Sequence, residues 1–544
     1  MLIHISHIVL VSLPARLFRY CSVFCAVAAI SSPSIVLASS TAVAAPISLE
    51  SLRELRREAM HRSRRIIFNN DGMDAVFKPR TEDSIEGILK LSTSALAGSH
   101  VDTIAYNTNI GGFGLFFHNT KVGEIFTSRE GIWLNNMTGP LIQQGTDPLR
   151  IMVDFARANR MEIFWSLRMN NTHDNKYPEL FSKFKRENPD FLMGTIAKPP
   201  QRGSWSAVDF GQPKVRDFIC RIVEEVCRNY DIDGVQLDYW RFPVLFRSTA
   251  EGRSPTSAER ADLTEMMRRI RGLSEEIGLA RGRPLLLALR VPDSIEYCRE
   301  VIGIELEQWL KEGMIDVLCV GGDVQLNPWE KSIALGRRFD VPVYPSFREA
   351  GTSIAEQLRP MRDAPEGWRG AALDAWSAGA SGIEVFNLMH VFPPEHPLYR
   401  ELGDPHVLRR RDRTYVATRR GPPGEKSWFG MGASRINLPI ITPNNPLMLI
   451  RGQPVSVPLW LGESEPATIH AARVRLNLPG LTKDDALSLL VNGKPAIYSG
   501  SEGDWAEFDV SPVLLAPGKN SLVIQMVSRA LALHDLSLQI IASQ

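Results

Sequence analysis

Residues 231–243, Asp-Ile-Asp-Gly-Val-Gln-Leu-Asp-Tyr-Trp-Arg-Phe-Pro, contain the stretch that decides the fold. Its apolar run, 234–237, follows an amphipathic helical pattern at 213–230 and ends directly before Asp238. A helical pattern, then a short buried run, then polar side chains is the repeating unit of folds in which helices cover a parallel sheet. The same unit recurs on both sides of this stretch.

Eight such runs occur between residues 65 and 386, at 65–69, 101–106, 161–167, 234–237, 285–289, 315–320, 341–344 and 382–386. The clearest helical stretches between them lie at 147–160, 213–230, 257–278, 304–312, 329–339 and 368–379. Eight alternating units predict an α/β fold of the (β/α)8 TIM barrel type, with long insertions after the first three strands. A doubly wound sheet is the alternative, but no G-x-G-x-x-G follows the first strand.

The pattern changes after residue 408. Residues 409–434 are rich in Arg, Gly and Pro and predict a linker. From 435 to 544 about seven short runs alternate apolar and polar residues, with a hairpin signal at Asn492-Gly493. These runs predict an all-β sandwich of the jelly-roll kind. We therefore expect a barrel over 46–408, a linker over 409–434 and an accessory sandwich over 435–544.

The first 45 residues resemble a targeting segment rather than part of the barrel. The apolar stretch 21–38 follows Arg16 and Arg19 and is succeeded by small residues up to Ala45, the order found in a secretory signal peptide. A buried N-terminal helix is the alternative, but Pro33 would interrupt it. The sequence thus predicts export to the periplasm or the medium.

Composition excludes some partners. Of the 544 residues 44% are hydrophobic and 23% charged, which is typical of a globular protein. Lys and Arg (62) nearly balance Asp and Glu (61), so we expect no nucleic-acid partner. No run beyond the first 45 residues is long and apolar enough to span a bilayer, so we expect no transmembrane anchor in the mature chain. The oligomeric state is left open.

Cysteine and histidine spacing gives little reason to expect a metal. Beyond residue 45 the cysteines are Cys220, Cys227, Cys298 and Cys319. The first two lie seven residues apart in a helical pattern, roughly 10 Å along its axis, which is too far for a disulfide. His173 and Asp174 with the distant His390 are a weak ligand set. We expect four cysteines in the core, no disulfide framework, no metal and no cofactor.

The stretch 208–243 resembles the glycosyl hydrolase-like 10 family, whose members share a pattern of the type D-P-G-x-P-x-V-R-D … D-v-D-G … D-D/Y-x-R-y-P. The matching residues are Asp209, Gly211, Pro213, Val215, Arg216, Asp217, Asp231, Asp233, Gly234, Asp238, Tyr239, Arg241 and Pro243, while Phe210 replaces the usual Pro. The resemblance implies a glycosidase-like barrel directed at polysaccharides. The strand also looks like the chitinase signature D-G-x-D-x-D-x-E, but Gln236 replaces an Asp and the catalytic Glu is missing.

Polar side chains follow each predicted strand, where a barrel of this type carries its active site. Together they predict a polar cleft of the size of a sugar, whose substrate would be a polysaccharide or oligosaccharide. The predicted substrate contacts are Asn69, Asn70, Asp71, Asn107, Arg168, Asn170, Tyr239, Trp240, Arg241, Arg290, Asp323, Tyr344 and Asn387. For any single Asn, satisfying the loop backbone is the plainer interpretation. Trp205 is a further stacking candidate, and Trp165 is expected in the core.

Glycoside hydrolysis needs two carboxyl groups beside the scissile bond. Asp238 is the first candidate, because alternation along its strand directs Gln236 and Asp238 into the barrel. Glu384 is the second, because burial in an apolar strand raises the pKa of a carboxyl group. For each acid the alternative is an ion pair with an arginine: for Asp238 with Arg168, Arg241 or Arg290. Asp71 and Asp323 are substitutes for the second role.

Two functional classes remain. One is a glycoside hydrolase that cleaves O-glycosidic bonds in a polysaccharide by acid/base catalysis; the other is a barrel that binds glycan without cleaving it. A second carboxylate about 5–10 Å from Asp238 would favour the first, and arginines alone the second. No G-x-S-x-G or H-E-x-x-H supports another hydrolase. Residues 490–526 resemble the galactose-binding-like jelly rolls of glycosidases, which implies a carbohydrate-binding or packing role, with Trp505 the first residue to test.

Overall fold

The computed structural model describes residues 47–80, 82–322, 325–348, 359–418, 435–463 and 465–543. The predicted signal peptide and residues 419–434 of the predicted linker lie outside them. In the part of the chain that is described, no helix is long and apolar enough to cross a membrane.

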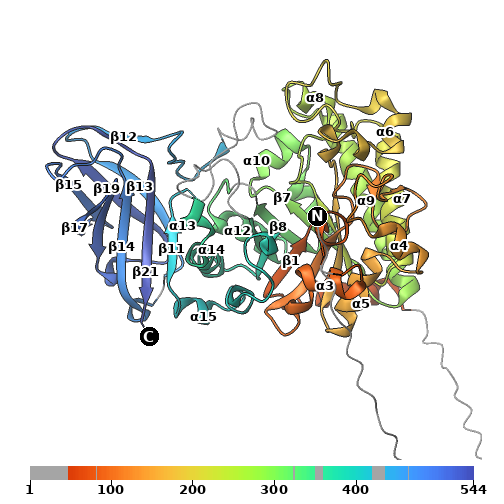
Figure 1. Ribbon diagram of the computed structural model, residues 1–544, viewed down its shortest axis with the longest axis horizontal. Coiled ribbons are helices and arrows are strands. Elements are labelled where there is room, and N and C mark those ends of the chain that lie inside the picture. The colour runs from red at the N-terminus through yellow and green to blue at the C-terminus, as the bar shows by residue number, and fades with distance from the viewer. Residues whose placement is uncertain are drawn as a thin grey trace, which may run out of the picture. The chain divides into compact units, whose positions relative to one another are not determined.

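Eight parallel strands close into a barrel in the order β1-β10-β9-β8-β7-β6-β5-β2, and in Figure 1 the helices of this part of the chain lie outside its strands. The strands are β1 (Ile66–Asn70), β2 (Val101–Asn107), β5 (Glu162–Arg168), β6 (Gly234–Asp238), β7 (Leu286–Val291), β8 (Val317–Gly322), β9 (Val343–Arg348) and β10 (Ile383–Phe386). The predicted TIM barrel is confirmed, and each predicted run overlaps one of these strands.

The helices between the strands follow the sequence signals. They are α1 (Leu49–Met60), α2 (Met73–Val76), α3 (Ile85–Ser92), α4 (Thr138–Gln143), α5 (Pro148–Ala158), α6 (Lys183–Glu187), α7 (Pro213–Asn229), α8 (Arg247–Ala250), α9 (Ser257–Arg281), α10 (Ile295–Tyr297), α11 (Leu306–Lys311), α12 (Trp329–Arg338), α13 (Arg359–Asp363), α14 (Pro365–Ser377) and α15 (Pro405–Arg409). Helix α9 begins at a capping box formed by Thr256 and Glu259. It runs past Gly278, its predicted end, to Gly282, whose φ of 69° is the left-handed conformation that ends many helices.

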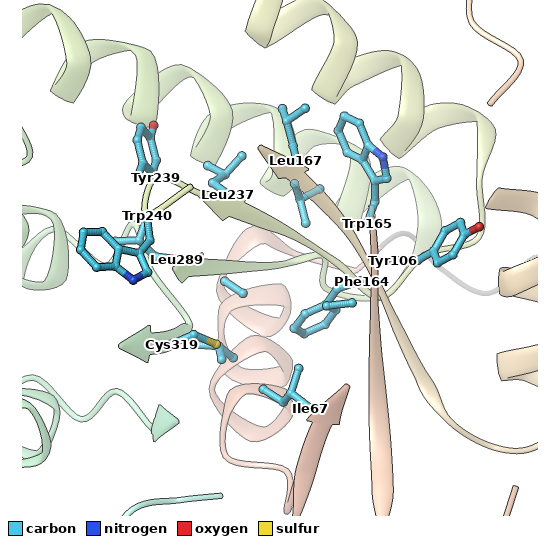
Figure 2. Packing of buried hydrophobic residues seen from close by; sticks show 14 of the residues in the cluster. Ile67, Tyr106, Phe164, Trp165, Leu167, Leu237, Tyr239, Trp240, Leu289 and Cys319 are labelled. Carbon is cyan, nitrogen blue, oxygen red and sulfur yellow. The ribbon is translucent and has the colours of Figure 1, made fainter. Parts of the chain in front are cut away.

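Side chains alternate across the barrel wall. Figure 2 shows Trp165 and Leu237 on the side of the strands that faces the helices, and Phe164 and Cys319 on the other side. All four are fully buried. Trp165 is in the core, as predicted, and its Nε1 donates to Thr108 Oγ1 at 2.8 Å. The cysteines predicted in the core, Cys220, Cys227, Cys298 and Cys319, are all buried.

The C-terminal part is an antiparallel β domain, which confirms that prediction. One sheet has the order β11-β21-β14-β18-β17 and the other β13-β19-β15-β16, with the pair β12-β20 beside them. The strands are β11 (Arg413–Val416), β12 (Leu447–Leu449), β13 (Val455–Leu461), β14 (Ile469–Asn477), β15 (Leu487–Val491), β16 (Lys494–Pro495), β17 (Ile497–Glu502), β18 (Trp505–Val510), β19 (Gly518–Met526), β20 (Leu531–Leu533) and β21 (Asp535–Ala542). Strand β11 lies inside the predicted linker, yet it pairs with β21.

Candidate active site

A buried ion-pair triad occupies the C-terminal half of the barrel interior. Arg290 on β7 donates from Nη1 to both oxygens of Asp238 on β6, at 3.1 and 3.2 Å. Its Nε donates to Glu384 Oε2 on β10 at 3.1 Å. The three side chains are between 0% and 1% exposed. The two predicted catalytic acids therefore share one guanidinium, and the alternative of an ion pair with Arg290 holds for Asp238.

The two acids differ in their remaining partners. Asp238 Oδ1 accepts from the backbone N–H groups of Trp240 and Arg241, at 3.0 and 2.9 Å, because the chain turns directly after β6. Glu384 Oε1 accepts instead from two neutral side chains inside the barrel, Gln236 Nε2 at 2.5 Å and Asn69 Nδ2 at 3.2 Å. Glu384 thus belongs to an enclosed polar network, whereas Asp238 lies at the end of its strand.

A third carboxylate, Asp71, follows β1 and is more exposed than the other two. Its Oδ2 accepts from Asn387 Nδ2 at 2.7 Å and lies 3.6 Å from Arg168 Nη2 at the end of β5. Its Oδ1 lies 4.0 Å from His390 Nε2. The Asp71 side chain is 6% exposed and the imidazole of His390 is 22% exposed. Asp71 therefore lies near a solvent-exposed group at the ends of the strands.

Phe386 connects the two arginines. The guanidinium of Arg290 lies 4.5 Å from the centre of its ring, and that of Arg168 lies 5.7 Å from it. Phe386 is the last residue of β10 and faces the interior because it is two residues after Glu384. The sequence analysis did not identify it, although its spacing from Glu384 would have placed it on the same face. Asp71, Arg168, Phe386, Arg290 and Asp238 thus form one connected group at the carboxyl ends of five strands.

Two turns hold Asp71 in position, one at Gly72 directly after it and one at Asn387 after β10. Asn387 adopts a left-handed φ of 54° directly after β10, which lets its side chain contact Asp71. Gly72 has a φ of 78°, and a Cβ there would lie 2.2 Å from the Phe117 ring and 2.5 Å from the Asn107 carbonyl oxygen. No residue with a side chain fits at position 72 without a shift of its neighbours.

Several predicted substrate contacts are engaged within the protein. Asn70 donates to Asp74 and Ser92. Asn107 donates to Asn109 Oδ1 and to the carbonyl of Ser166. Asn170 donates to the carbonyls of Val208 and Val244, 38 and 74 residues away. These three asparagines are buried and hold loops together, which is the plainer interpretation considered for them.

The aromatic candidates also lie in packed surroundings. Figure 2 shows Tyr239 on the helix side of its strand; it is fully buried, with its hydroxyl 3.5 Å from Met267 Sδ on α9. Trp240 is buried edge-on against Tyr297, with 5.7 Å between ring centroids. Trp205 stacks on Phe181, at 5.6 Å. These contacts replace the sugar-stacking surface that the sequence predicted for these side chains.

Tyr344 lies at the wrong end of the barrel for a substrate contact. The strand that was predicted to end there, β9, begins one residue earlier, and a Cβ on Gly382 at the start of β10 would lie 2.8 Å from the Tyr344 ring. Its hydroxyl interacts with Arg64, whose guanidinium pairs with Glu162 at the first residue of β5. Burial raises the pKa of Tyr344 to about 12.

Three predicted residues remain: the substrate contacts Arg241 and Asp323, and the metal-ligand candidate Asp174. Arg241 is half-buried, with its guanidinium 5.1 Å from the centre of the Phe242 ring. Asp323 lies outside the described residues. Asp174, considered as a metal ligand, pairs with buried Lys185 at 2.5 Å and accepts from Ser206. Among the described residues no three His, Cys, Asp or Glu side chains are grouped to hold a metal ion.

Residues 114–251 match the family model described as glycosyl hydrolase-like 10. The resemblance to that family is confirmed over this segment. It contains Asp238, Arg168 and the insertion after β5, but neither Asp71 nor Glu384. The sequence of this segment is therefore glycosyl-hydrolase-like.

Two curated relatives that are named glycosyl hydrolases match part of the chain. The chain is 30% identical over 124 residues to glycosyl hydrolase YngK of Bacillus subtilis (strain 168), which is 22% of each chain. It is 32% identical over 111 residues to glycosyl hydrolase DigH of Escherichia coli (strain K12), 20% of this chain and 25% of that one. The match thus spans no more than 25% of these relatives. Among solved structures, the glycoside hydrolase domain of PgaB (BpsB) from Bordetella bronchiseptica gives a TM-score of 0.38 at 12% identity, covering 63% of this chain and 98% of that one.

Proposed function

We propose that this protein is an exported glycoside hydrolase that cleaves O-glycosidic bonds in a polysaccharide, with Asp238 and Asp71 as its two carboxyl groups. The observation that carries the proposal is the connected group of Asp71, Arg168, Phe386, Arg290 and Asp238, because it brings two carboxylates to the carboxyl ends of the strands, where barrels of this type bind substrate. The family of the segment that contains Asp238 supports the reaction class.

The surroundings of the two acids suit different roles. Asp238 accepts from one guanidinium and two backbone N–H groups, so its oxygens are held as acceptors, which suits a nucleophile or general base. Asp71 has its Oδ1 4.0 Å from the partly exposed imidazole of His390, which offers a route for protons, and this suits the general acid. The buried ring of Phe386 and the buried guanidinium of Arg168 connect the two acids within one group.

Glu384 fits a positioning role better than the catalytic role predicted for it. Its carboxylate is as buried as that of Asp238, but besides Arg290 it accepts from Gln236 and Asn69 inside the barrel, whereas Asp238 lies at the end of its strand. What it does in this arrangement is fix the Arg290 guanidinium, which in turn holds Asp238. In the proposed reaction Glu384 acts through Arg290 and touches no substrate.

The second candidate function is a barrel that binds carbohydrate without cleaving it. The observation in its favour is that Asp238 faces an arginine, whose charge both Asp238 and Glu384 neutralise. In that case the same group of residues would hold sugar hydroxyls by hydrogen bonds, with no proton transfer.

Reducing-sugar release from a panel of polysaccharides separates the two candidates. The variants are Asp238→Asn and Asp71→Asn, with Asp154→Asn on the exposed side of α5 as the matched control. A loss of about 100-fold or more in both site variants, with unchanged thermal midpoints, supports the hydrolase, because acid/base groups contribute factors of this size. Binding of a glycan without release of reducing ends supports the second candidate instead. Export is tested separately by N-terminal sequencing of the protein recovered outside the cytoplasm.

A further inference from the structure

A groove with a surplus of cations lies between the insertions that follow β2 and β5, and none of Asp71, Asp238 and Glu384 lines it. It encloses about 780 Å³ between the loop at 114–124, helix α6 and the first turns of α7. Five cationic and three anionic side chains line it, namely Lys121, Lys183, Lys214, Arg221, Arg269, Glu124, Glu187 and Asp217. Cations exceed anions by two, in a chain whose overall net charge is only +1.

One face of α7 supplies four of the thirteen residues that line the groove. Lys214, Asp217, Phe218 and Arg221 follow the spacing i, i+3, i+4 and i+7, which places them on a single stripe of the helix. Phe218 packs against Phe184 of α6 with 4.7 Å between ring centroids, so the groove has an aromatic wall. The exposed cations of the stripe therefore lie beside an aromatic wall.

The anionic side chains of the groove are already paired. Asp217 accepts from Arg269 at 2.6 Å. Glu124 accepts from Arg129 at 2.9 Å. Although burial opposes it, the hydrogen bond from the Lys183 backbone N–H, followed by the guanidiniums of Arg129 and Arg186, lowers the pKa of this carboxyl group. Glu187 lies 3.6 Å from Lys183 Nζ. These pairs neutralise the acids and use two of the five cations of the groove.

The other three cations, Lys121, Lys214 and Arg221, are exposed, and within the described residues none of their side chains makes an ion pair or a side-chain hydrogen bond. Three cations on one groove attract a polyanion at low ionic strength, and salt weakens that attraction. The aromatic wall and the paired carboxylates add a face for sugar rings and acceptors for their hydroxyls.

We propose that this groove binds a segment of an anionic polysaccharide, through Lys121, Lys214 and Arg221, as a second site that holds the polymer while the ends of the strands act on it. A nucleic acid is the other polyanion that such cations attract, and the test below distinguishes it from a polysaccharide. The binding step itself does not depend on hydrolysis and is measured without it.

The test is affinity electrophoresis of the full-length mature protein in native gels that contain polygalacturonate, dextran sulfate, neutral dextran or single-stranded DNA. The variant carries Lys121→Gln, Lys214→Gln and Arg221→Gln. The matched control carries Lys311→Gln, Lys494→Gln and Lys519→Gln, three exposed lysines on other parts of the surface. Each gel is run at two NaCl concentrations.

We expect polygalacturonate or dextran sulfate to retard the wild type and the control, with an apparent Kd at least 10-fold weaker for the groove variant and a smaller effect of NaCl on it. If only polygalacturonate retards the protein, the groove prefers carboxylates; if only dextran sulfate does, it prefers sulfates. Equal retardation of the groove variant and the control overturns the proposal. The proposal is also overturned if neither polygalacturonate nor dextran sulfate retards the wild type. Tighter binding of DNA, lost in the groove variant, would replace the polysaccharide by a nucleic acid. None of these results depends on whether Asp238 and Asp71 cleave a glycan.

Discussion

Replacement of Arg290 by methionine removes the cation that two buried carboxylates share. Arg290 lies 3.1 Å from both Asp238 and Glu384, and all three side chains are at most 1% exposed. Removing one member of a buried ion pair costs about 3–5 kcal/mol, because it leaves a charge buried without its partner. Arg290→Met leaves two such charges, so we expect a loss in the free energy of unfolding at the upper end of that range or above it.

Urea unfolding followed by tryptophan fluorescence at pH 5 and pH 8 measures this loss. A buried carboxylate that has lost its cation takes up a proton as the pH falls, so the loss should be smaller at pH 5 than at pH 8. Adding Glu384→Gln to Arg290→Met removes one buried charge and should recover at least about 1 kcal/mol. Arg228→Met, which breaks an exposed pair with Glu224, is the control, with an expected cost of about 1 kcal/mol or less. If Arg290→Met costs no more than this control, or costs the same at both pH values, the triad does not stabilise the barrel as argued.

Two further predictions concern other buried charges. Burial lowers the pKa of His118 from 6.5 to about 4, so between these values the unfolded chain binds a proton that the folded chain does not. Stability should therefore fall by about 1.4 kcal/mol per pH unit as the pH drops from 6.5 to 4. His118→Phe should remove this part of the pH dependence in urea unfolding, and an unchanged slope would contradict it. Arg362 on α13 donates to Asp535 on β21 at 2.7 Å, with both side chains at most 1% exposed. Arg362→Met should cost about 3–5 kcal/mol and Arg362→Met/Asp535→Leu much less; equal thermal midpoints of the two variants would refute this.

The barrel could be predicted from sequence because each strand is a short apolar run, bounded by turn residues and separated from the next by a helical period. The exact ends were harder. Strand β9 was predicted over 341–344, with its end at Tyr344. In the structure Pro345 stays in the strand, opposite Val320, and the strand continues to Arg348. This shift of one strand moved Tyr344 from the predicted cleft to the opposite end of the barrel.

The location of the candidate site could be predicted from the sequence, but the partners of its side chains could not. Alternation along β6 correctly directed Gln236 and Asp238 inward, since Gln236 bonds to Glu384 across the barrel. Strands β8 and β9 separate Arg290 from Glu384 in the sequence. Alternation cannot show that the Arg290 guanidinium nevertheless lies between the two acids. Nor can it show that Asn170 serves two backbone carbonyls of distant loops. Contacts of this kind depend on how far side chains reach inside the closed barrel, and a single sequence carries no record of that.

The most direct test of the central claim is reducing-sugar release by Asp71→Asn beside Asp238→Asn and Glu384→Gln, on whichever polysaccharide the wild type cleaves. The account predicts that Asp71→Asn and Asp238→Asn each lose activity by about 100-fold or more while folding and binding the glycan. It predicts a smaller loss for Glu384→Gln, whose side chain acts through Arg290. Full activity in Asp71→Asn, together with complete loss in Glu384→Gln at an unchanged thermal midpoint, would contradict the account and return the second catalytic role to Glu384.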